Sequence, residues 1–289
     1  MAEVSEVAFA TTSDSWLRGK LLLRQPTKGH RVGSDAALLA AAAPEAERIV
    51  DVGAGVGAVG LALLKRMTGA RADLLEIDPE LAALAAANAA ENALAERTRV
   101  VVADVTAAAS RRAAGLSDGA AVLVVTNPPF FDAQNVRVSP VARRARAHVL
   151  SSAAPEANSR SATDAWLIGA LALLAPGGRF AMIHRPGALG AILASLENRL
   201  GAIAILPIYP YAEAQAHRLL IAGVKGARAP LSFRPALVLH EPSGAFTKEA
   251  EAVHTGEATI SLVAARSVRR RPRPATPPQP GPSAGGTAR

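Results

Sequence analysis

Short runs of aliphatic residues alternate along most of this chain with alanine-rich stretches of helical length. The expected strands cover residues 48–51, 72–77, 98–103, 121–126, 179–184, 202–208 and 217–224. The expected helices cover residues 36–43, 59–67, 79–92 and 163–174, and a further helix ends at residue 200. Alternation on this scale favours parallel strands joined by helical crossovers. The sequence therefore predicts an α/β fold with a doubly wound, mostly parallel sheet.

Three segments lie outside this alternation. Residues 16–25 are expected to form a hairpin around Arg18-Gly19-Lys20, and residues 231–239 a further strand outside the regular sheet. Residues 131–162 form a long polar connection. Loops of this length in compact domains are usually functional or disordered.

Positive charge is concentrated at the end of the chain. The net charge of the 289 residues is +8, and the part from Ala258 onward holds six arginines and no acidic residue, which leaves about +2 for the rest. Because a segment rich in arginine, proline and glycine buries little apolar surface, it does not offset its ordering entropy. We expect a flexible N-terminus over residues 1–13, one domain over 14–265 and a disordered tail over 266–289. The tail is either an extension without a function or a nucleic-acid-binding arm.

Composition excludes several classes of site. The chain has no cysteine, which rules out disulfides, thiolate metal sites and a cysteine nucleophile. We expect no metal site, since the six histidines are scattered. The N-terminus has no apolar core of a secretory signal, and no run approaches the roughly 18 apolar residues of a membrane span. We expect a cytoplasmic protein that does not bind membranes.

A glycine segment, Asp51-Val52-Gly53-Ala54-Gly55-Val56-Gly57, follows the first strand of the alternation. Gly53-x-Gly55-x-Gly57 is the methyltransferase pattern, whereas Gly55-x-Gly57-x-x-Gly60 matches the dinucleotide fingerprint. Gly53 is the first glycine after the strand, which favours the methyltransferase pattern and makes Gly60 a helix-packing residue. Asp51 precedes the turn, within reach of a cationic amino group of the cofactor.

Acidic residues close the next two strands. Glu76 can accept both ribose hydroxyls of an adenosine, which suits S-adenosylmethionine and NAD alike. Asp104 can accept from the adenine amino group or simply form a turn. Asp78, directly before Pro79, is expected to cap the following helix.

A second motif, Asn127-Pro128-Pro129-Phe130, follows the strand over residues 121–126. An aromatic amine is a poor nucleophile because its lone pair is delocalised into the ring. The Asn127 side-chain oxygen and the Pro128 carbonyl can accept both amine hydrogens, the prolines make the corner rigid, and Phe130 offers a stacking face. Beside a glycine turn, this corner indicates methyl transfer from S-adenosyl-L-methionine to a planar nitrogen, in which orientation carries the catalysis.

These motifs resemble those of class I S-adenosylmethionine-dependent amino methyltransferases. Residues 21–26, Leu-Leu-Leu-Arg-Gln-Pro, and 29–40, Gly-His-Arg-Val-Gly-Ser-Asp-Ala-Ala-Leu-Leu-Ala, narrow the resemblance to the tRNA1(Val) adenine-37 N6-methyltransferase family. The resemblance runs from about Asp14 to Leu262. It implies a Rossmann-like methyltransferase fold, a cofactor contact from Ser34 and Asp35, and a target adenine held at residues 127–130. A helix N-cap is the other role open to Ser34 and Asp35.

The sequence departs from the family at two points. Phe130 stands where tyrosine is frequent, and the arginine tail lies outside the family pattern. Arg143, Arg144 and Arg146 lie in the long connection that directly follows the corner, and they are expected to contact phosphates of RNA, in particular tRNA.

Several other functions remain open at this point. They are a protein glutamine N5-methyltransferase, a methyltransferase for another nucleobase amine, a non-catalytic RNA-binding module and, most distantly, an NAD-dependent oxidoreductase. The oligomeric state and the modified nucleotide do not follow from the sequence.

Overall fold

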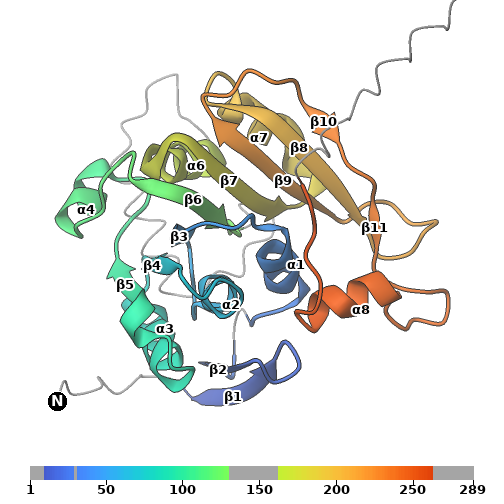
Figure 1. Cartoon of the computed structure of the whole chain (residues 1–289), viewed down its shortest axis with the longest axis horizontal. Helices are drawn as coiled ribbons and strands as arrows, with labels where there is room; N and C mark the ends of the chain where they lie inside the picture. Colours follow the sequence, from blue (N-terminus) through green and yellow to red (C-terminus); the bar gives the residue numbers. More distant parts are fainter. Residues whose placement is uncertain (1–9, 29–30, 130–161, 263–289) are drawn as a thin grey trace, which may run out of the picture.

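The computed structural model describes residues 10–28, 31–129 and 162–262. One nine-stranded sheet crosses the molecule, with eight strands in the order β10-β8-β9-β7-β6-β3-β4-β5 and β11 paired with β8 (Figure 1). Its parallel strands are β3 (Arg48–Val52), β4 (Arg71–Glu76), β5 (Thr98–Val102), β6 (Ala121–Thr126) and β7 (Leu174–His184). The predicted doubly wound α/β fold is confirmed.

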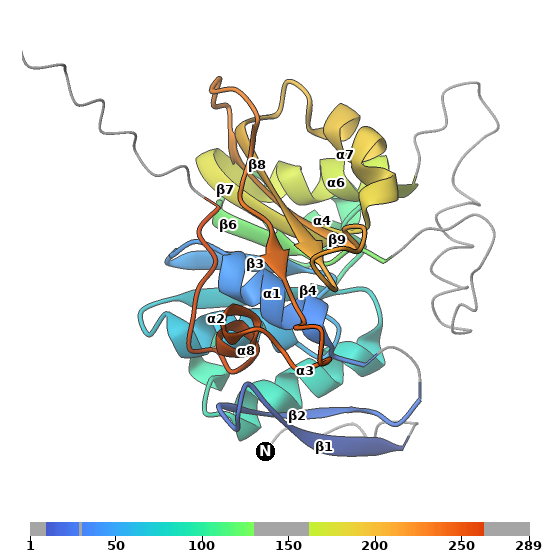
Figure 2. The same cartoon turned by 90° about the vertical axis from the view of Figure 1, so that its right-hand side faces the viewer.

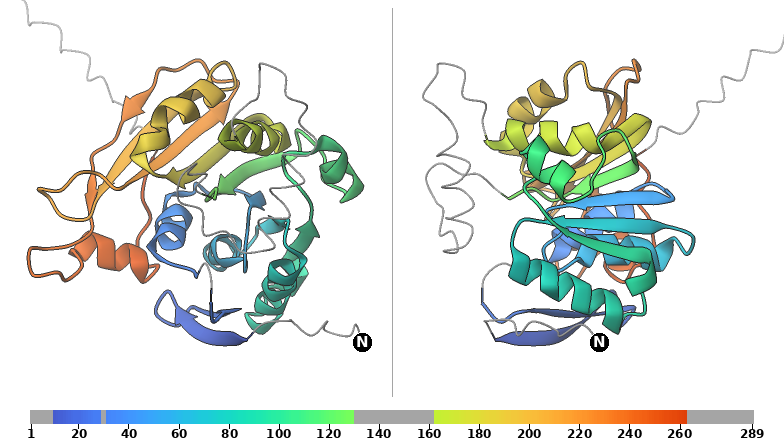
Figure 3. Two further views of the ribbon diagram at one scale, coloured as in Figure 1. Left: turned by 180° about the vertical axis from the view of Figure 1, so that it is seen from behind. Right: turned by 90° about the vertical axis from the view of Figure 1, so that its left-hand side faces the viewer.

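Helices cover both faces of this sheet. The helices are α1 (Ser34–Ala42), α2 (Ala58–Arg66), α3 (Pro79–Glu91), α4 (Ala108–Ala113), α6 (Ala162–Leu173), α7 (Leu189–Leu196) and α8 (Lys248–His254). One apolar core lies between the sheet and α1 and α2, and a second lies between the opposite face and α6 and α7 (Figure 3). The expected cap of α3 is confirmed, because the Asp78 carboxylate accepts from the backbone N–H groups of Glu80 and Leu81.

Among the described strands of this sheet, β9 departs from the parallel pattern. β9 (Arg218–Lys225) lies between β7 and β8 (Leu200–Tyr209) and is antiparallel to both. The expectation of a separate strand over residues 231–239 is wrong. Two short strands, β10 (Ser232–Phe233) and β11 (Leu237–Val238), pair in parallel with β8 and so extend the main sheet.

β7 begins earlier than the sequence indicates. The strand was expected over residues 179–184, yet β7 starts at Leu174, which pairs with Ala121, and includes Pro176-Gly177-Gly178. The register then shifts before Leu123 pairs with Arg179. The glycines lie in this irregularity, where Gly177 has a φ of 72°.

The predicted hairpin is confirmed and is longer than expected. β1 (Thr11–Trp16) pairs antiparallel with β2 (Leu21–Pro26), and Leu17, Arg18 and Gly19 take positive φ values in the turn. The hairpin forms its own two-stranded sheet beside α3 (Figure 2). β1 starts at Thr11, before the domain boundary expected at residue 14. The tail boundary stays a prediction because residues 263–289 lie outside the described residues.

In the parts of the chain that the structure describes, no helix is both long and apolar enough to cross a membrane.

Candidate functional site

Four of the residues predicted to form the site lie at or just after the carboxyl ends of four adjacent strands. Val52 at the end of β3 pairs with Leu75 of β4 on one side and with Thr126 of β6 on the other, and Glu76 pairs with Val102 of β5. Gly53, Glu76, Asp104 and Asn127 therefore lie along one edge of the sheet. The chain reverses its direction of winding between β3 and β6, which is where open α/β sheets bind ligands.

The glycine turn needs three left-handed residues. Gly53, Gly55 and Gly57 have φ values of 72°, 56° and 86°, which other residues adopt only at a cost. The turn is fastened to β4, because the N–H groups of Gly53 and Ala54 both donate to the Leu75 carbonyl, at 2.8 and 3.0 Å. A Cβ atom on Gly55 would meet no atom within 4 Å, so the turn borders open space at that residue.

Gly60 packs inside the fold, as the sequence predicts. It lies in α2, where a Cβ atom would approach Leu74 Cδ2 to 2.2 Å. Its backbone N–H donates to Asp51 Oδ2 at 2.8 Å. Gly60 therefore lets α2 approach the sheet closely and is not part of a phosphate-binding turn.

Asp51 lies beneath the glycine turn, with only 2% of its surface exposed. Burial raises the pKa of its carboxyl group from 3.8 to about 7, against the opposing effect of the Gly60 hydrogen bond, and the charge of Glu76 adds to the increase. A buried carboxylate of this kind is well suited to meet a cation that arrives with a ligand. The expected contact with a cofactor amino group stays a prediction.

The Glu76 carboxylate holds the turn through backbone hydrogen bonds. Oε2 accepts from the Gly55 N–H at 2.8 Å, while Oε1 accepts from Ile77 and Asp78 at 2.8 and 3.0 Å. Burial raises the pKa of Glu76, and the three hydrogen bonds oppose this effect. Because each carboxylate oxygen can accept more than one hydrogen bond, Oε2 keeps capacity for a ribose hydroxyl.

Of the two roles considered for Asp104, the structure shows the turn-forming one. Its Oδ1 accepts from the Thr106 N–H at 2.8 Å and from the Thr106 hydroxyl at 2.7 Å. This arrangement fixes the side chain at the end of β5, and its predicted contact with adenine is untested.

The Asn127 corner directly adjoins the glycine turn. Asn127 is half-buried, Pro128 is buried and Pro129 is exposed. Among the described residues, the Asn127 side chain has no hydrogen-bond partner. Its amide oxygen is thus able to accept from a ligand. Phe130, Arg143, Arg144 and Arg146 lie outside the described residues, so their predicted roles are untested.

Trp166 joins the two motifs and was missed by the sequence analysis. Its indole N–H donates to the Thr126 hydroxyl at 3.0 Å, and that hydroxyl donates to the Val52 carbonyl at 2.8 Å. The same indole lies so close to Gly53 that a Cβ atom there would come within 2.8 Å of it. The only sequence signal was a scarce tryptophan, one of two in the chain, on the helix after the long connection.

The segment before α1 differs from one interpretation of its sequence. The N-cap residue of α1 is Gly33, which has no side chain to cap the helix, and Ser34 and Asp35 already belong to the first turn. The N-cap role considered for Ser34 and Asp35 is therefore wrong. Asp35 instead accepts from Arg218 Nε on β9 with both carboxylate oxygens, at 2.9 and 2.8 Å. This ion pair joins the start of α1 to the sheet. The cofactor contact predicted for Ser34 and Asp35 stays a prediction.

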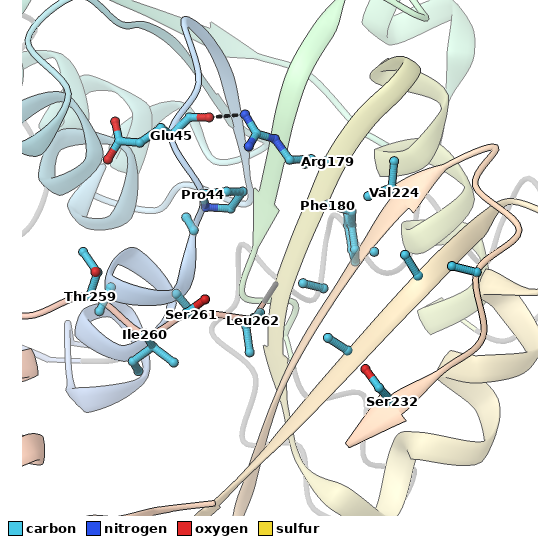
Figure 4. A pocket seen from close by; sticks show the side chains of 18 of the residues that line it. Pro44, Glu45, Arg179, Phe180, Val224, Ser232, Thr259, Ile260, Ser261 and Leu262 are labelled. Atoms are coloured by element: carbon cyan, nitrogen blue, oxygen red, sulfur yellow. Dashed lines mark hydrogen bonds between the residues drawn. The ribbon is translucent and has the colours of Figure 1, made fainter. Parts of the chain in front are cut away.

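A separate cavity of about 550 Å³ lies elsewhere in the molecule (Figure 4). Its walls come from the end of α1, from Arg179 and Phe180 of β7, from β8 and β9, and from residues 259–262. None of these lining residues belongs to the predicted site, so the cavity has no part in the arrangement described above.

Comparisons with known proteins match this chain to methyltransferases. The methyltransferase small domain family matches residues 30–150. A tRNA1(Val) (adenine(37)-N6)-methyltransferase of an Enterobacter species is 39% identical over 105 residues, which are 35% of this chain and 41% of that protein. The relative from Dickeya chrysanthemi with the same name is 35% identical over 156 residues, or 53% and 56% of the two chains. The chain thus spans between about two fifths and just over half of these relatives.

The structural comparison covers more of the chain. A crystal structure described as a predicted O-methyltransferase from Agrobacterium tumefaciens is 32% identical, with a TM-score of 0.65. The match covers 78% of this chain and 98% of the other. The structure of M. jannaschii TYW2 in complex with AdoMet has a TM-score of 0.50 at 14% identity and covers 76% and 88%, which is a likeness of fold alone.

Proposed function

We propose that this chain, which belongs to the S-adenosylmethionine-dependent methyltransferases, methylates the exocyclic N6 amine of an adenine in tRNA. The resemblance to the tRNA1(Val) adenine-37 family is confirmed by its curated relatives. Because the chain spans only part of those relatives, their substrate comes to it as a proposal.

One observation carries this proposal, namely the position of the Asn127 corner beside the glycine turn. Val52 and Thr126 are direct partners in neighbouring strands, so Gly53 and Asn127 are each one residue beyond the same pair. Trp166 contacts both sides of this junction. A cofactor held at the turn and an amine held at the corner would therefore be neighbours.

The residues at the turn fit an adenosine cofactor. Gly55 leaves open space beside the turn, and Glu76 would present a carboxylate to ribose hydroxyls. Asp51 supplies a buried carboxyl group whose ionised form a cationic amine would favour. When bound, S-adenosylmethionine supplies an electrophilic methyl group on a sulfonium. A dinucleotide cofactor would need the third glycine of its fingerprint, Gly60, beside a pyrophosphate at the helix N-terminus. Gly60 is instead packed against Leu74 inside the fold.

The chemistry at the corner requires two acceptors. The Asn127 side-chain oxygen and the Pro128 carbonyl would each accept one hydrogen of the target amine, which localises the nitrogen lone pair for attack. The rigid prolines keep these acceptors in place, so little reorganisation is needed in the transition state. The amine loses its extra proton to solvent after transfer, and the protein forms no covalent intermediate.

An oxygen acceptor is the second candidate, since the Agrobacterium relative is described as a predicted O-methyltransferase. A hydroxyl has one hydrogen, so it would need a base rather than two acceptors. The described corner offers an amide and two prolines, none of which is a base, while Asp51 lies buried beneath the turn. These residues favour a planar amine.

The test is methylation of defined substrates with labelled S-adenosylmethionine. Unmodified tRNA transcripts should gain label, and nuclease digestion followed by mass spectrometry should identify N6-methyladenosine. Label on a protein glutamine would support the N5-glutamine alternative, and label on a sugar or base oxygen would support an O-methyltransferase. Binding of S-adenosylmethionine without methyl transfer to any of these substrates would favour a non-catalytic RNA-binding module. Binding of NAD in place of S-adenosylmethionine would contradict the assignment of the cofactor.

A further inference from the structure

Two asparagines, Asn88 of α3 and Asn92 at its C-cap, complete the edge of β2. Asn92 Oδ1 accepts from the Leu22 N–H at 2.9 Å, and its Nδ2 donates to the Leu22 carbonyl at 2.7 Å. Asn88 pairs in the same way with Arg24, at 2.7 and 3.0 Å. Asparagines four residues apart lie on one helix face, and Leu22 and Arg24 lie on one strand edge. The two amides therefore act like an added strand.

The two asparagines differ in their remaining hydrogen bond. The second Nδ2 hydrogen of Asn88 is donated to the Val56 carbonyl at 2.9 Å, whereas that of Asn92 is donated to the Asn88 carbonyl at 2.8 Å. Val56 lies in the glycine turn, and Asn92 makes no contact there through its amide. Asn88 thus connects the hairpin to the turn.

The hydrogen bond from Asn88 to the Val56 carbonyl lies next to the turn residue that contacts Glu76. Val56 lies between Gly55 and Gly57, both left-handed, and the Gly55 N–H is the donor to Glu76 Oε2. The Val56 carbonyl and the Gly55 N–H belong to different peptide groups of the same short turn, so a change in the backbone angles between them would move this donor. Asn88 has no exposed surface, so water cannot replace the bond if the amide is removed.

We propose that Asn88 is a positioning residue of the cofactor site, which holds the Val56 carbonyl and thereby the turn that presents Gly55 and Glu76. This inference rests on the proposed function, because it assumes that the turn binds S-adenosylmethionine. Asn88 itself touches no reacting group. It couples the turn to the β1–β2 hairpin, so order in either one should increase order in the other.

The experiment compares Asn88→Asp with Asn92→Asp. Each substitution keeps the Oδ1 acceptor and replaces both amide donors with an oxygen that repels the facing carbonyl groups, so both should lower the melting temperature. Only the first removes a bond to the turn. Calorimetry should show that Asn88→Asp weakens binding of S-adenosylhomocysteine by roughly tenfold, as expected for one buried hydrogen bond, while Asn92→Asp leaves the affinity unchanged.

Equal losses of affinity in the two variants would overturn the proposal, because they would show a general effect of loosening the hairpin. No loss in either variant would also overturn it. Failure of the wild-type protein to bind the ligand would instead refute the proposed function.

A measurement on the wild-type protein covers the case in which a variant does not fold. Coupling is reciprocal, so ligand bound at the turn should slow hydrogen exchange at the Arg24 amide, whose acceptor is Asn88. The Leu22 amide, whose acceptor is Asn92, is the internal control. Greater protection at Arg24 supports the proposal, and equal or absent protection contradicts it.

Discussion

The indole N–H of Trp166 donates to the hydroxyl of Thr126 at 3.0 Å, at the junction of the strands that carry the two motifs. Trp166→Phe keeps a ring near Gly53 but removes this bond. We expect the free energy of unfolding to fall by about 1 kcal/mol, and turnover to fall because the Asn127 corner is less well fixed.

The matched control is Trp16→Phe, which changes the other tryptophan, in the hairpin. Steady-state kinetics should show reduced turnover only for Trp166→Phe. Equal turnover in both variants would mean that Trp166 contributes to packing alone.

Gly53→Ala combines backbone strain with a steric conflict. Gly53 and Gly177 share a φ of 72°, but a Cβ atom would meet Trp166 at Gly53 and nothing within 4 Å at Gly177. Alanine at either position should cost about 1–2 kcal/mol in backbone strain. Only Gly53→Ala should add about 1–3 kcal/mol of overpacking and weaken cofactor binding.

Urea unfolding of both variants separates these two effects. If Gly53→Ala and Gly177→Ala lost the same free energy of unfolding, the close approach of Trp166 to the turn would be refuted.

The sequence was sufficient to predict most of the sheet because the parallel strands contain aliphatic runs and because some helices carry a local signal at their ends. Asp78 before Pro79 is an example, where a local signal determined the start of α3. Glu76 and Asn127 lie at the ends of predicted strands, so their positions at the carboxyl edge of the sheet followed from the sequence, while their roles stay predictions. Contacts between distant segments were not predictable, since nothing local to Trp166, Asn88 or Asp35 indicates Thr126, Val56 or Arg218 as a partner.

The pairing of the short strands at the edge of the sheet was not predictable from the sequence either. Pairing of β10 and β11 with β8 depends on where the chain returns in space, and residues 231–239 contain no signal for that path.

Asp51 should make stability depend on pH. Its carboxyl has a pKa of about 7 in the native protein, against an ordinary value of 3.8. The native state therefore retains a proton between these values that the unfolded state releases, so stability should fall as pH rises from about 4 to 7, by at most about 1.4 kcal/mol per pH unit. Asp51→Asn should flatten this slope, because an amide does not titrate.

Urea unfolding at pH 5 and pH 7 without ligand checks this expectation. Glu76, whose pKa is also raised, contributes a slope of the same sign to both proteins. Parallel profiles for wild type and Asp51→Asn would contradict the role given to the buried carboxyl.

The arginine tail should add affinity for RNA without placing the substrate. Removing the chain from Ser267 onward deletes five arginines at 269–271, 273 and 289. RNA binding should weaken and depend less steeply on salt, since fewer counterions are released, while turnover at saturating RNA stays normal. Neutralising Arg143, Arg144 and Arg146 should reduce saturating turnover as well. The dependence of methylation rate on RNA concentration distinguishes the tail deletion from the variant of the three connection arginines. If the tail deletion lowered saturating turnover and the arginine variant did not, the roles assigned to the two segments would be reversed.

Asn127 is proposed to hold the target amine and not the cofactor. The direct test is to measure, for Asn127→Ala, both the dissociation constant for S-adenosylmethionine and single-turnover methylation of saturating tRNA. We predict an unchanged dissociation constant and a methylation rate lower by about 10²-fold or more, because one preorganised acceptor is lost from the transition state. Methylation at the wild-type rate would contradict the account.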